Sequence, residues 1–571
     1  MSSTPHASSR HPQHGTWMQA ANNVRAAIAL YAGVGIAMLW PAFGPGQLFL
    51  HDMSWPEQLN VSSYAHHGIT ASLPLLCVLR LLNYVIPAGL LQKLLLLSLL
   101  TLCGVGMYAL QKKLSAAQGF FAVLAGLIYM LNPYAIDRLA AGQWMVLAGY
   151  ACLPIFAWFM YDAFTAPSRH NVLRVLAAWA IYPVISMHWW YIVTLFSVPA
   201  VLYLLARGHG KRRGASTLAI HVQRDAVVAP WLYVVLPAVG ICWLLFLSIH
   251  YGGVTGVIDS HDFTAFATRP AELLGAWGSV LSLRGFWYNP LSDIPSALTP
   301  LWFVVCAGLL ALTYRTLLAL HRRHPSRATY AAWVFIGAVL LAVGYGSSLG
   351  RWIVDIYRAV VPGFNGLRDT QKIVGLIAFI YALAAPYALQ QAWDVRASRK
   401  HITYLVPAFV GAYMLCMLVA IGALHYTVTP HRYPADWQAV NSTFYYHQPK
   451  RVLILPWNGY IHLPFAGNAL VANPAATYFA AAADTRQNNG IAALDAAHGL
   501  SSFDRSVLSL RTSPNALTDV RAHGYDYIVL LKTEDYARYK QQLDDAGLEL
   551  LSNGSSLYLY RTKQQLVNQS F

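Results

Sequence analysis

The sequence predicts an α-helical polytopic membrane protein of about eleven transmembrane helices, followed by an α/β domain outside the membrane. Three observations support this fold class. Many segments are apolar and long enough to cross a bilayer. Basic residues gather in every second connection between those segments, as the positive-inside rule requires. Near Tyr426 the composition changes to short strand-like and helix-like segments.

The apolar segments make up most of the chain. Of the 571 residues, 57% are hydrophobic and only 11% are charged, whereas a soluble protein carries about 25% charged residues. A bilayer core of about 30 Å needs roughly 20 apolar residues in a helix. The fifth and sixth spans are short, and only the segment HWWY separates them. The candidate spans are 25–43, 91–111, 118–133, 144–165, 172–187, 189–206, 229–249, 297–320, 328–348, 371–392 and 402–425.

The distribution of basic residues sets the orientation. The formal net charge is +16, but the lysines and arginines lie mostly in short loops beside the spans, so topogenic charge explains it better than nucleic-acid binding. We expect a bacterial inner-membrane protein with a cytoplasmic tail (1–24), a membrane domain (25–425) and an extracytoplasmic domain (426–571). In this orientation, five basic clusters lie on the inner side of the membrane. They are Lys112 and Lys113; Arg169 and Arg174; Arg207, Lys211, Arg212, Arg213 and Arg224; Arg322, Arg323 and Arg327; and Arg396, Arg399 and Lys400.

The connections on the outer side differ in length. Three are long or polar: 44–90, 250–296 and 349–370. The second half of the first, SLPLLCVLRLLNYVIPAGLL, is apolar but contains an arginine, an asparagine and two prolines, which favours helices that lie in the membrane interface. In the last domain, LILPW, GYDYIVLL and SLYLYR are predicted strands, and ALTDVRAHG and DYARYKQQLDDAG are predicted helices.

Asp52 is the candidate catalytic residue of the first outer loop. It lies in GPGQLFLHDMSWPEQ, just after the first span, between apolar neighbours and next to His51. An aspartate in apolar surroundings gains basicity, so Asp52 could deprotonate a hydroxyl group with His51 beside it. The alternative is a helix cap or an ion pair within the loop.

A second candidate group is the segment FNGLRDTQK at the outer end of the tenth span. Arg368 and Lys372 are four residues apart and would share one face of a helix. A guanidinium and an ammonium at a helix start suit a lipid-linked phosphate. Two structural alternatives remain: the cations snorkel to the interface, or Asp369 pairs with Arg368 and holds the loop.

The third group combines a candidate metal site with an aromatic surface in the loop 250–296. Asp259, His261 and Asp262 could bind a divalent cation such as Mg²⁺, Mn²⁺ or Ca²⁺, although their spacing matches no strict ligand pattern. No other cofactor is indicated. Two further cations on the same side, Arg138 and Arg284, are candidates for binding the phosphate. The candidates for binding the sugar are the aromatic and polar residues Trp55, Gln143, His188, Trp189, Trp287 and Tyr288.

The chain resembles the GT-C superfamily of polytopic membrane glycosyltransferases. The resemblance rests on LFLHDMSWP, AGQWMVLAGYACLP, RGFWY, GLRDTQK and the domain opening RYPADW with VLILPWNGY. These segments are similar to those of mycobacterial arabinofuranosyltransferases and of YfhO-like membrane proteins. The resemblance implies transfer of a sugar from a polyprenyl-phosphate carrier on the outer face, and Asp52 lies where the catalytic aspartate of the family is expected. Asp52 lacks the second adjacent acid of the commoner motif, which puts metal dependence in doubt.

Two classes of function follow from these residues. In the first, an inverting glycosyltransferase uses Asp52 as the general base and the cations to hold the leaving phosphate. Its partners would be a polyprenyl-phosphate-linked sugar, an envelope glycan, glycolipid or protein acceptor, and membrane lipid. The alternative is a transporter or flippase for lipid-linked glycans, or a non-catalytic assembly partner. A transporter would be expected to carry charges and broken helices near the midplane, and the predicted spans contain few acidic residues.

Overall fold

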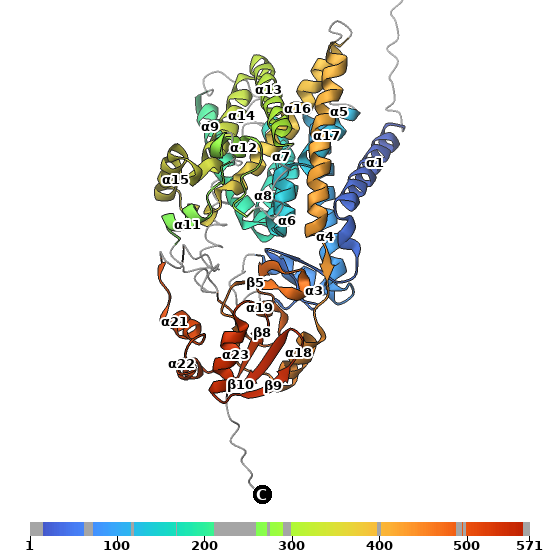
Figure 1. Cartoon of the computed structure of the whole chain (residues 1–571). Coiled ribbons are helices and arrows are strands. Elements are labelled where there is room, and N and C mark those ends of the chain that lie inside the picture. The colour runs from blue at the N-terminus through green and yellow to red at the C-terminus, as the bar shows by residue number, and fades with distance from the viewer. Residues whose placement is uncertain are drawn as a thin grey trace, which may run out of the picture.

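The computed structural model describes residues 15–61, 72–115, 119–166, 168–210, 258–270, 274–288, 298–396, 401–486, 494 and 498–562. Figure 1 shows a bundle of long helices at one end and a smaller α/β part at the other, with a few short strands and α3 (Leu73–Asn83) between them. The candidate site lies in this middle layer, because its residues come from both parts.

Six helical segments of the described chain are long and apolar enough to cross a membrane. A seventh is obtained if a bent pair counts as one span. The predicted count of about eleven is therefore not reached among the described residues. Two predicted spans appear as shorter apolar helices (Val24–Met38 and Leu173–Ile185), and the predicted span 229–249 lies outside the described residues. The six segments contain α4 (Ala88–Ser115), α7 (Trp144–Thr165), α13 (Thr299–Arg323), α14 (Pro325–Val343), α16 (Val374–Asp394) and α17 (Ile402–Thr427).

The bundle contains further helices besides these six and the bent pair. They are α1 (Gly15–Met38), α8 (Arg169–Ile185), α9 (Met187–Gly210), α11 (Ser260–Ala265), α12 (Gly275–Leu281) and α15 (Ser348–Val360). α3 lies in the first predicted outer loop and exposes Val78, Leu81 and Leu82 by 52%, 66% and 43%. An apolar helix with such an exposed side is the pattern expected for a helix in the membrane interface.

The bent pair of helices determines the position of Arg138. α5 (Phe120–Met130) and α6 (Pro133–Ala140) meet at an angle of 41°. Asn132 separates them: its side chain accepts a hydrogen bond from Ala135 N at 3.0 Å and donates to Ile128 O at 3.0 Å. Pro133 follows at the first helical position, where a missing N–H costs nothing. A new helix therefore starts here and carries Arg138 in its last turn.

A small sheet joins the first predicted outer loop to the end of the last span. β1 (Gln47–Leu50) pairs antiparallel with β2 (Met53–Ser54) on one side and β3 (Pro430–His431) on the other, giving the order β2-β1-β3. Phe49 is opposite Ser54, and Leu48 is opposite Pro430. His51 and Asp52 form the turn of the β1–β2 hairpin.

The α/β part is built on a five-stranded sheet of order β7-β4-β8-β10-β9. β7, β4 and β8 are parallel, and β8, β10 and β9 are antiparallel. Side chains of β8 alternate between two apolar clusters, with Ile528 and Leu530 on one face and Val529 on the other. Both faces are therefore covered, which explains the uninterrupted apolar run YIVLL. The strands are β4 (Val452–Leu455), β7 (Ala483–Asp484), β8 (Tyr527–Leu531), β9 (Glu549–Asn553) and β10 (Leu557–Arg561).

Helices and a separate hairpin complete this part. The helices are α18 (Ala435–His447), α19 (Ala475–Tyr478), α21 (Ser502–Ser509), α22 (Ala516–Ala522) and α23 (Tyr536–Asp545). The hairpin of β5 (Tyr460–Leu463) and β6 (Ala469–Ala472) rests on the β1–β2 hairpin. Ala472 N donates to His51 O at 2.7 Å, and Ser54 Oγ donates to Ala472 O at 2.8 Å. The α/β part thereby contacts the turn that carries Asp52.

Candidate active site

The carboxylate of Asp52 is held from two sides. Gln143 Nε2 donates to Oδ2 at 2.8 Å, and the Tyr460 hydroxyl donates to Oδ1 at 2.7 Å. The backbone N–H of Asp52 donates to Ala141 O at 2.8 Å. Each carboxylate oxygen has room for a further hydrogen bond, so Asp52 can still accept a proton or a hydroxyl hydrogen. The contacts come from the loop after α6 and from β5.

Residues of α4 fix the strand before Asp52. Gln92 accepts from Leu48 N at 2.8 Å and donates to Leu48 O at 3.0 Å, so its side-chain amide pairs with β1 as a neighbouring strand would. Lys93 Nζ donates to the carbonyl groups of Gly44 and Gly46. Both α4 side chains are buried. The position of Asp52 is therefore tied to the membrane helix α4.

His51 is a stacked, neutral ring. Its ring lies 3.8 Å from the ring of Tyr288 and 4.4 Å from that of Tyr460, centroid to centroid, and nearly parallel to both. Trp287 contacts it edge-on at 5.8 Å. Burial lowers the pKa of His51, although the Asp52 carboxylate and the Leu470 carbonyl oppose the change. The imidazole is thus uncharged at neutral pH and forms part of an aromatic wall beside Asp52.

A buried ion pair between Arg138 and Asp369 lies close to these aromatic residues. Arg138 is fully buried, and its Nη1 lies 2.9 Å from Asp369 Oδ2. The same guanidinium donates to the side-chain oxygens of Gln143 and Gln371. Gln143 therefore links Asp52 to Arg138. Burial by itself would raise the pKa of Asp369, but Arg138 and Lys372 outweigh it, so the pKa is lowered and the carboxylate stays charged.

Arg368 and Lys372 do not share a helical face, so that prediction is wrong. They belong to two separate 3₁₀ turns, η3 (Phe364–Leu367) with Arg368 at its end and η4 (Thr370–Ile373). Arg368 Nη1 lies 3.0 Å from Asp262 Oδ1, and Lys372 Nζ lies 3.7 Å from Asp369 Oδ2. The alternative pairing of Asp369 with Arg368 is not formed either. The two turns interrupt the α-helical spacing on which the prediction depended.

The three cationic side chains Arg138, Lys372 and Arg368 differ in how much of their surface is exposed. The Arg138 side chain is 0% exposed, that of Lys372 is 10% and that of Arg368 is 32%. Arg368 is therefore the most accessible of these three cations, and Lys372 keeps only a small exposed fraction. Arg138 contacts Gln143 and Asp369. Arg284 is buried, and its carbonyl group accepts a hydrogen bond from Gln371 Nε2 at 3.3 Å.

The aromatic residues predicted to bind a sugar fall into two groups, one beside His51 and one in the apolar core. Trp287 and Tyr288 line the wall beside His51. Trp55 is 3% exposed and packs edge-on against Trp144, and Trp189 is 0% exposed and packs beside Tyr150, so both belong to the apolar core. His188 interacts electrostatically with the nearby charged group Lys372, Asp369, Arg138 and Arg368.

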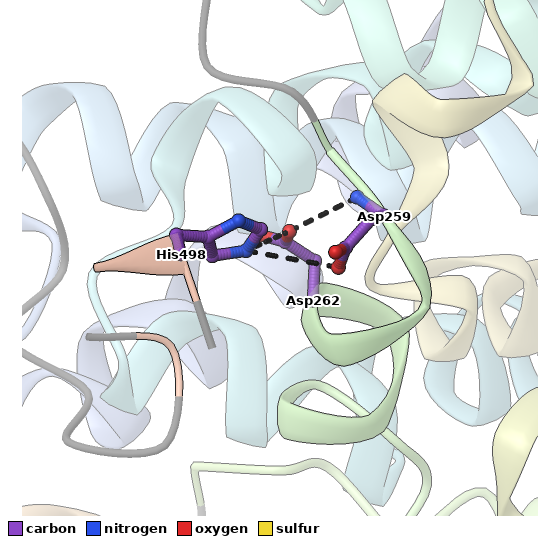
Figure 2. Close-up of side chains that lie close together, drawn as sticks. All are labelled: Asp259, Asp262 and His498. Atoms are coloured by element: carbon purple, nitrogen blue, oxygen red, sulfur yellow. Dashed lines mark hydrogen bonds and ion pairs between the residues drawn. The ribbon is translucent and has the colours of Figure 1, made fainter. Parts of the chain in front are cut away.

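The structure adds two residues that the sequence did not single out. Tyr460 reaches Asp52 from 408 positions later in the chain, and no local pattern marks it. His498 takes a place in the candidate metal group: its ring nitrogen and one carboxylate oxygen each of Asp259 and Asp262 lie within 4.8 Å of one another (Figure 2). His261, the predicted third ligand, is not part of this group and instead contacts Asp259 at 3.1 Å.

The comparisons with known proteins identify the family. The profile of the alpha-(1->3)-arabinofuranosyltransferase family, N-terminal GT-C domain, matches residues 73–532, which is more than half of the chain. The chain belongs to this family. It is thus a multi-pass membrane protein of the GT-C glycosyltransferase class, which confirms the predicted superfamily. Asp52 precedes the matched residues. No curated protein matches the chain.

Solved structures of this GT-C family share the fold. The cryo-EM structure of arabinofuranosyltransferase AftD from mycobacteria matches with a TM-score of 0.61 and 13% sequence identity, over 95% of this chain and 40% of that chain. A mutant form of the same mycobacterial protein matches with a TM-score of 0.53 and 12% identity, over 95% and 42%. The chain thus spans less than half the length of these GT-C proteins.

Proposed function

We propose that this GT-C protein transfers a sugar from a polyprenyl-phosphate carrier to a hydroxyl group of an extracytoplasmic acceptor. One observation carries the proposal: the Asp52 carboxylate, held by Gln143 and Tyr460, is joined through Gln143 to the bonded group of Arg138, Asp369 and Lys372, with which the more exposed Arg368 interacts electrostatically. A base beside cations is what transfer of a sugar away from a phosphate requires.

The proposed reaction is a single displacement with inversion at the anomeric carbon. Asp52 accepts the proton of the acceptor hydroxyl while the acceptor oxygen bonds to the anomeric carbon. The bond from that carbon to the phosphate oxygen breaks, and the phosphate leaves with its electrons. Arg368 and Lys372 stabilise the negative charge that develops there. Arg138, Asp369 and Gln143 act as positioning residues, because they are bonded to one another and to Asp52.

The aromatic wall is proposed to bind the sugar ring. His51, Trp287 and Tyr288 present stacked and edge-on rings next to Asp52. A neutral His51 leaves the charge of Asp52 free for the acceptor proton. The family name supports an arabinofuranosyl group as the sugar. We propose an envelope glycan or glycolipid as acceptor, and the outer face of the bacterial inner membrane as the location.

The position of the charges supports an enzyme over a transporter. A transporter places its binding site near the middle of the spans, between broken helices. Here Arg138 lies in the last turn of α6 and Lys372 lies just before α16 begins. The charged residues that the structure brings together therefore gather at the ends of helices, next to the β1–β2 hairpin.

The test is an assay of the purified full chain in nanodiscs. A polyprenyl-phosphate arabinofuranose and an arabinofuranosyl oligosaccharide serve as substrates, and mass spectrometry measures the product. Asp52→Asn keeps the size and both hydrogen-bond partners but removes the basicity, so turnover should fall by about 10²–10⁴-fold. The matched control is Asp355→Asn, since Asp355 is an acid of α15 paired with Arg358. A folded Asp52→Asn protein with normal turnover contradicts the proposal.

A further inference from the structure

Two aspartates and one histidine converge next to the candidate active site. Asp259 caps α11 and Asp262 lies in its first turn, whereas His498 comes from the α/β part (Figure 2). His498 Nε2 lies 3.2 Å from Asp262 Oδ2 and 3.6 Å from Asp259 Oδ1. One donor atom from each residue lies within 4.8 Å of the other two. The three groups therefore fit around one ion.

The local structure of α11 explains part of this arrangement. Asp259 accepts from His261 N at 2.7 Å, and Asp262 accepts from Asp259 N at 3.2 Å, so the two carboxylates form a capping box. A capping box needs no histidine. The presence of His498, 236 positions away from Asp262, is not explained by helix capping. It brings a metal-binding side chain from another part of the chain to the same two oxygens.

Neighbouring side chains hold the donors in place. Arg368 Nη1 lies 3.0 Å from Asp262 Oδ1, whereas Oδ2 accepts from Asp259 N at 3.2 Å and keeps a second lone pair for an ion. His261 Nδ1 lies 3.1 Å from Asp259 Oδ2, whereas Oδ1 accepts from His261 N at 2.7 Å and likewise keeps a second lone pair. Hydrogen bonds of this kind, from residues that do not touch the metal, orient the ligands of metal sites. The Asp262 side chain is only 6% exposed, so its charge depends on compensating partners.

We propose that Asp259, Asp262 and His498 bind one divalent transition-metal ion, with Mn²⁺ or Zn²⁺ as the chemical class. Carboxylates alone would favour Mg²⁺ or Ca²⁺, but an imidazole ligand shifts the preference toward transition metals. Because α11 and His498 belong to different parts of the molecule, the ion fastens the helical bundle to the α/β part. It also fixes Asp262, the ion-pair partner of Arg368. The site goes beyond the proposed glycosyl transfer, which does not require an ion.

The test titrates Mn²⁺ into the purified full chain after removal of metals with EDTA. Electron paramagnetic resonance measures free Mn²⁺, and the wild-type chain should bind one ion that Zn²⁺ displaces and Mg²⁺ does not. His498→Ala and Asp259→Asn should each weaken binding by more than the roughly 10–100-fold that loss of a group outside the ligand shell causes. Asparagine caps a helix as well as aspartate does, so Asp259→Asn keeps α11 intact if His498→Ala fails to fold.

The matched control is His261→Ala. His261 is next to the site and touches Asp259 but does not belong to the group, so its loss should weaken Mn²⁺ binding by at most the roughly 10–100-fold of an orienting group, and by less than the loss of His498. The proposal is overturned if the wild type does not bind Mn²⁺, if His498→Ala binds as well as the wild type, or if His261→Ala weakens binding as much as His498→Ala. Binding is measured without substrate, so this outcome and that of the Asp52→Asn assay are independent.

Discussion

At the scale of single residues, Gln143 is the contact on which the candidate site depends. Its amide donates to Asp52 and accepts from Arg138, so it couples the position of Asp52 to that of the buried ion pair. The sequence singled out Gln143 only as a possible sugar ligand. The structure places it between two charged groups, where it orients Asp52 and need not touch the substrate.

Gln143→Glu tests this positioning role. The variant keeps the size and the contact with Arg138 but places a second carboxylate beside Asp52. Like charges favour protonation, so the acid limb of the pH profile of kcat/KM should move to higher pH, while turnover recovers at alkaline pH. The measurement is the pH profile of the variant and the wild type in the nanodisc assay. An unchanged profile with a uniformly lower rate would instead indicate a purely structural role.

At the scale of elements, α4 holds the hairpin that carries Asp52 through the side chain of Gln92. Gln92 satisfies both backbone groups of Leu48, and Leu48 is fully buried. Gln92→Leu would leave a buried N–H and a buried carbonyl group without a partner, and each such group costs about 1–3 kcal/mol. We expect a lower midpoint of thermal unfolding in detergent and a loss of turnover, because β1 carries the chain into Asp52.

Gln111 of the same helix supplies the matched control for Gln92→Leu. It is equally buried, but its Nε2 has no hydrogen-bond partner among the described residues. Gln111→Leu should therefore leave the thermal midpoint unchanged or raise it. Equal losses in both variants would show that α4 simply does not tolerate leucine, and the proposed pairing with β1 would then have no support.

Elements with continuous apolar runs could be predicted from the sequence, and short irregular turns could not. The predicted spans 91–111 and 144–165 fall within α4 and α7, since length and hydropathy alone define such helices. The prediction of one helical face for Arg368 and Lys372 was wrong because two 3₁₀ turns replace the assumed helix. A change of helix type alters which side chains align, and composition does not reveal it.

Contacts between residues far apart in the sequence could not be predicted either. Asp52 was predicted from its local sequence as the catalytic base, but that sequence does not reveal its partner Tyr460, which is 408 positions away. His498 is 236 positions from Asp262. Nothing in the local sequence around Tyr460 or His498 encodes these approaches, because they arise when the α/β part packs against the bundle.

At the scale of the whole molecule, the direction of the helices makes the orientation testable. α4 begins beside the β1–β2 hairpin, where Gln92 and Lys93 contact the first loop, and ends with Lys112 and Lys113. Its 28 residues span about 42 Å, enough to cross a bilayer. The hairpin and the basic end should therefore lie on opposite sides of the membrane.

Reporter fusions check this orientation. Fusions after Lys113 and Arg323 should report the cytoplasm, because both follow basic helix ends. A fusion near Asn441, in α18, should report the outside. Fusions after Arg213 and Lys400 should also report the cytoplasm, although both positions lie outside the described residues. A cytoplasmic signal near Asn441 would place the α/β part, and with it Tyr460, on the inner side.

The sheet order β2-β1-β3 has a consequence for biosynthesis. The strand that leads into Asp52 is synthesised among the first 50 residues, but its neighbour β3 emerges only at Pro430–His431, after α17. Tyr460 and the strand β6 that supports the turn come later still. A nascent or truncated chain thus lacks the contacts that hold Asp52. Under the proposed mechanism, the chain would become competent only after the α/β part has been synthesised, and half-made chains would not act on the sugar donor.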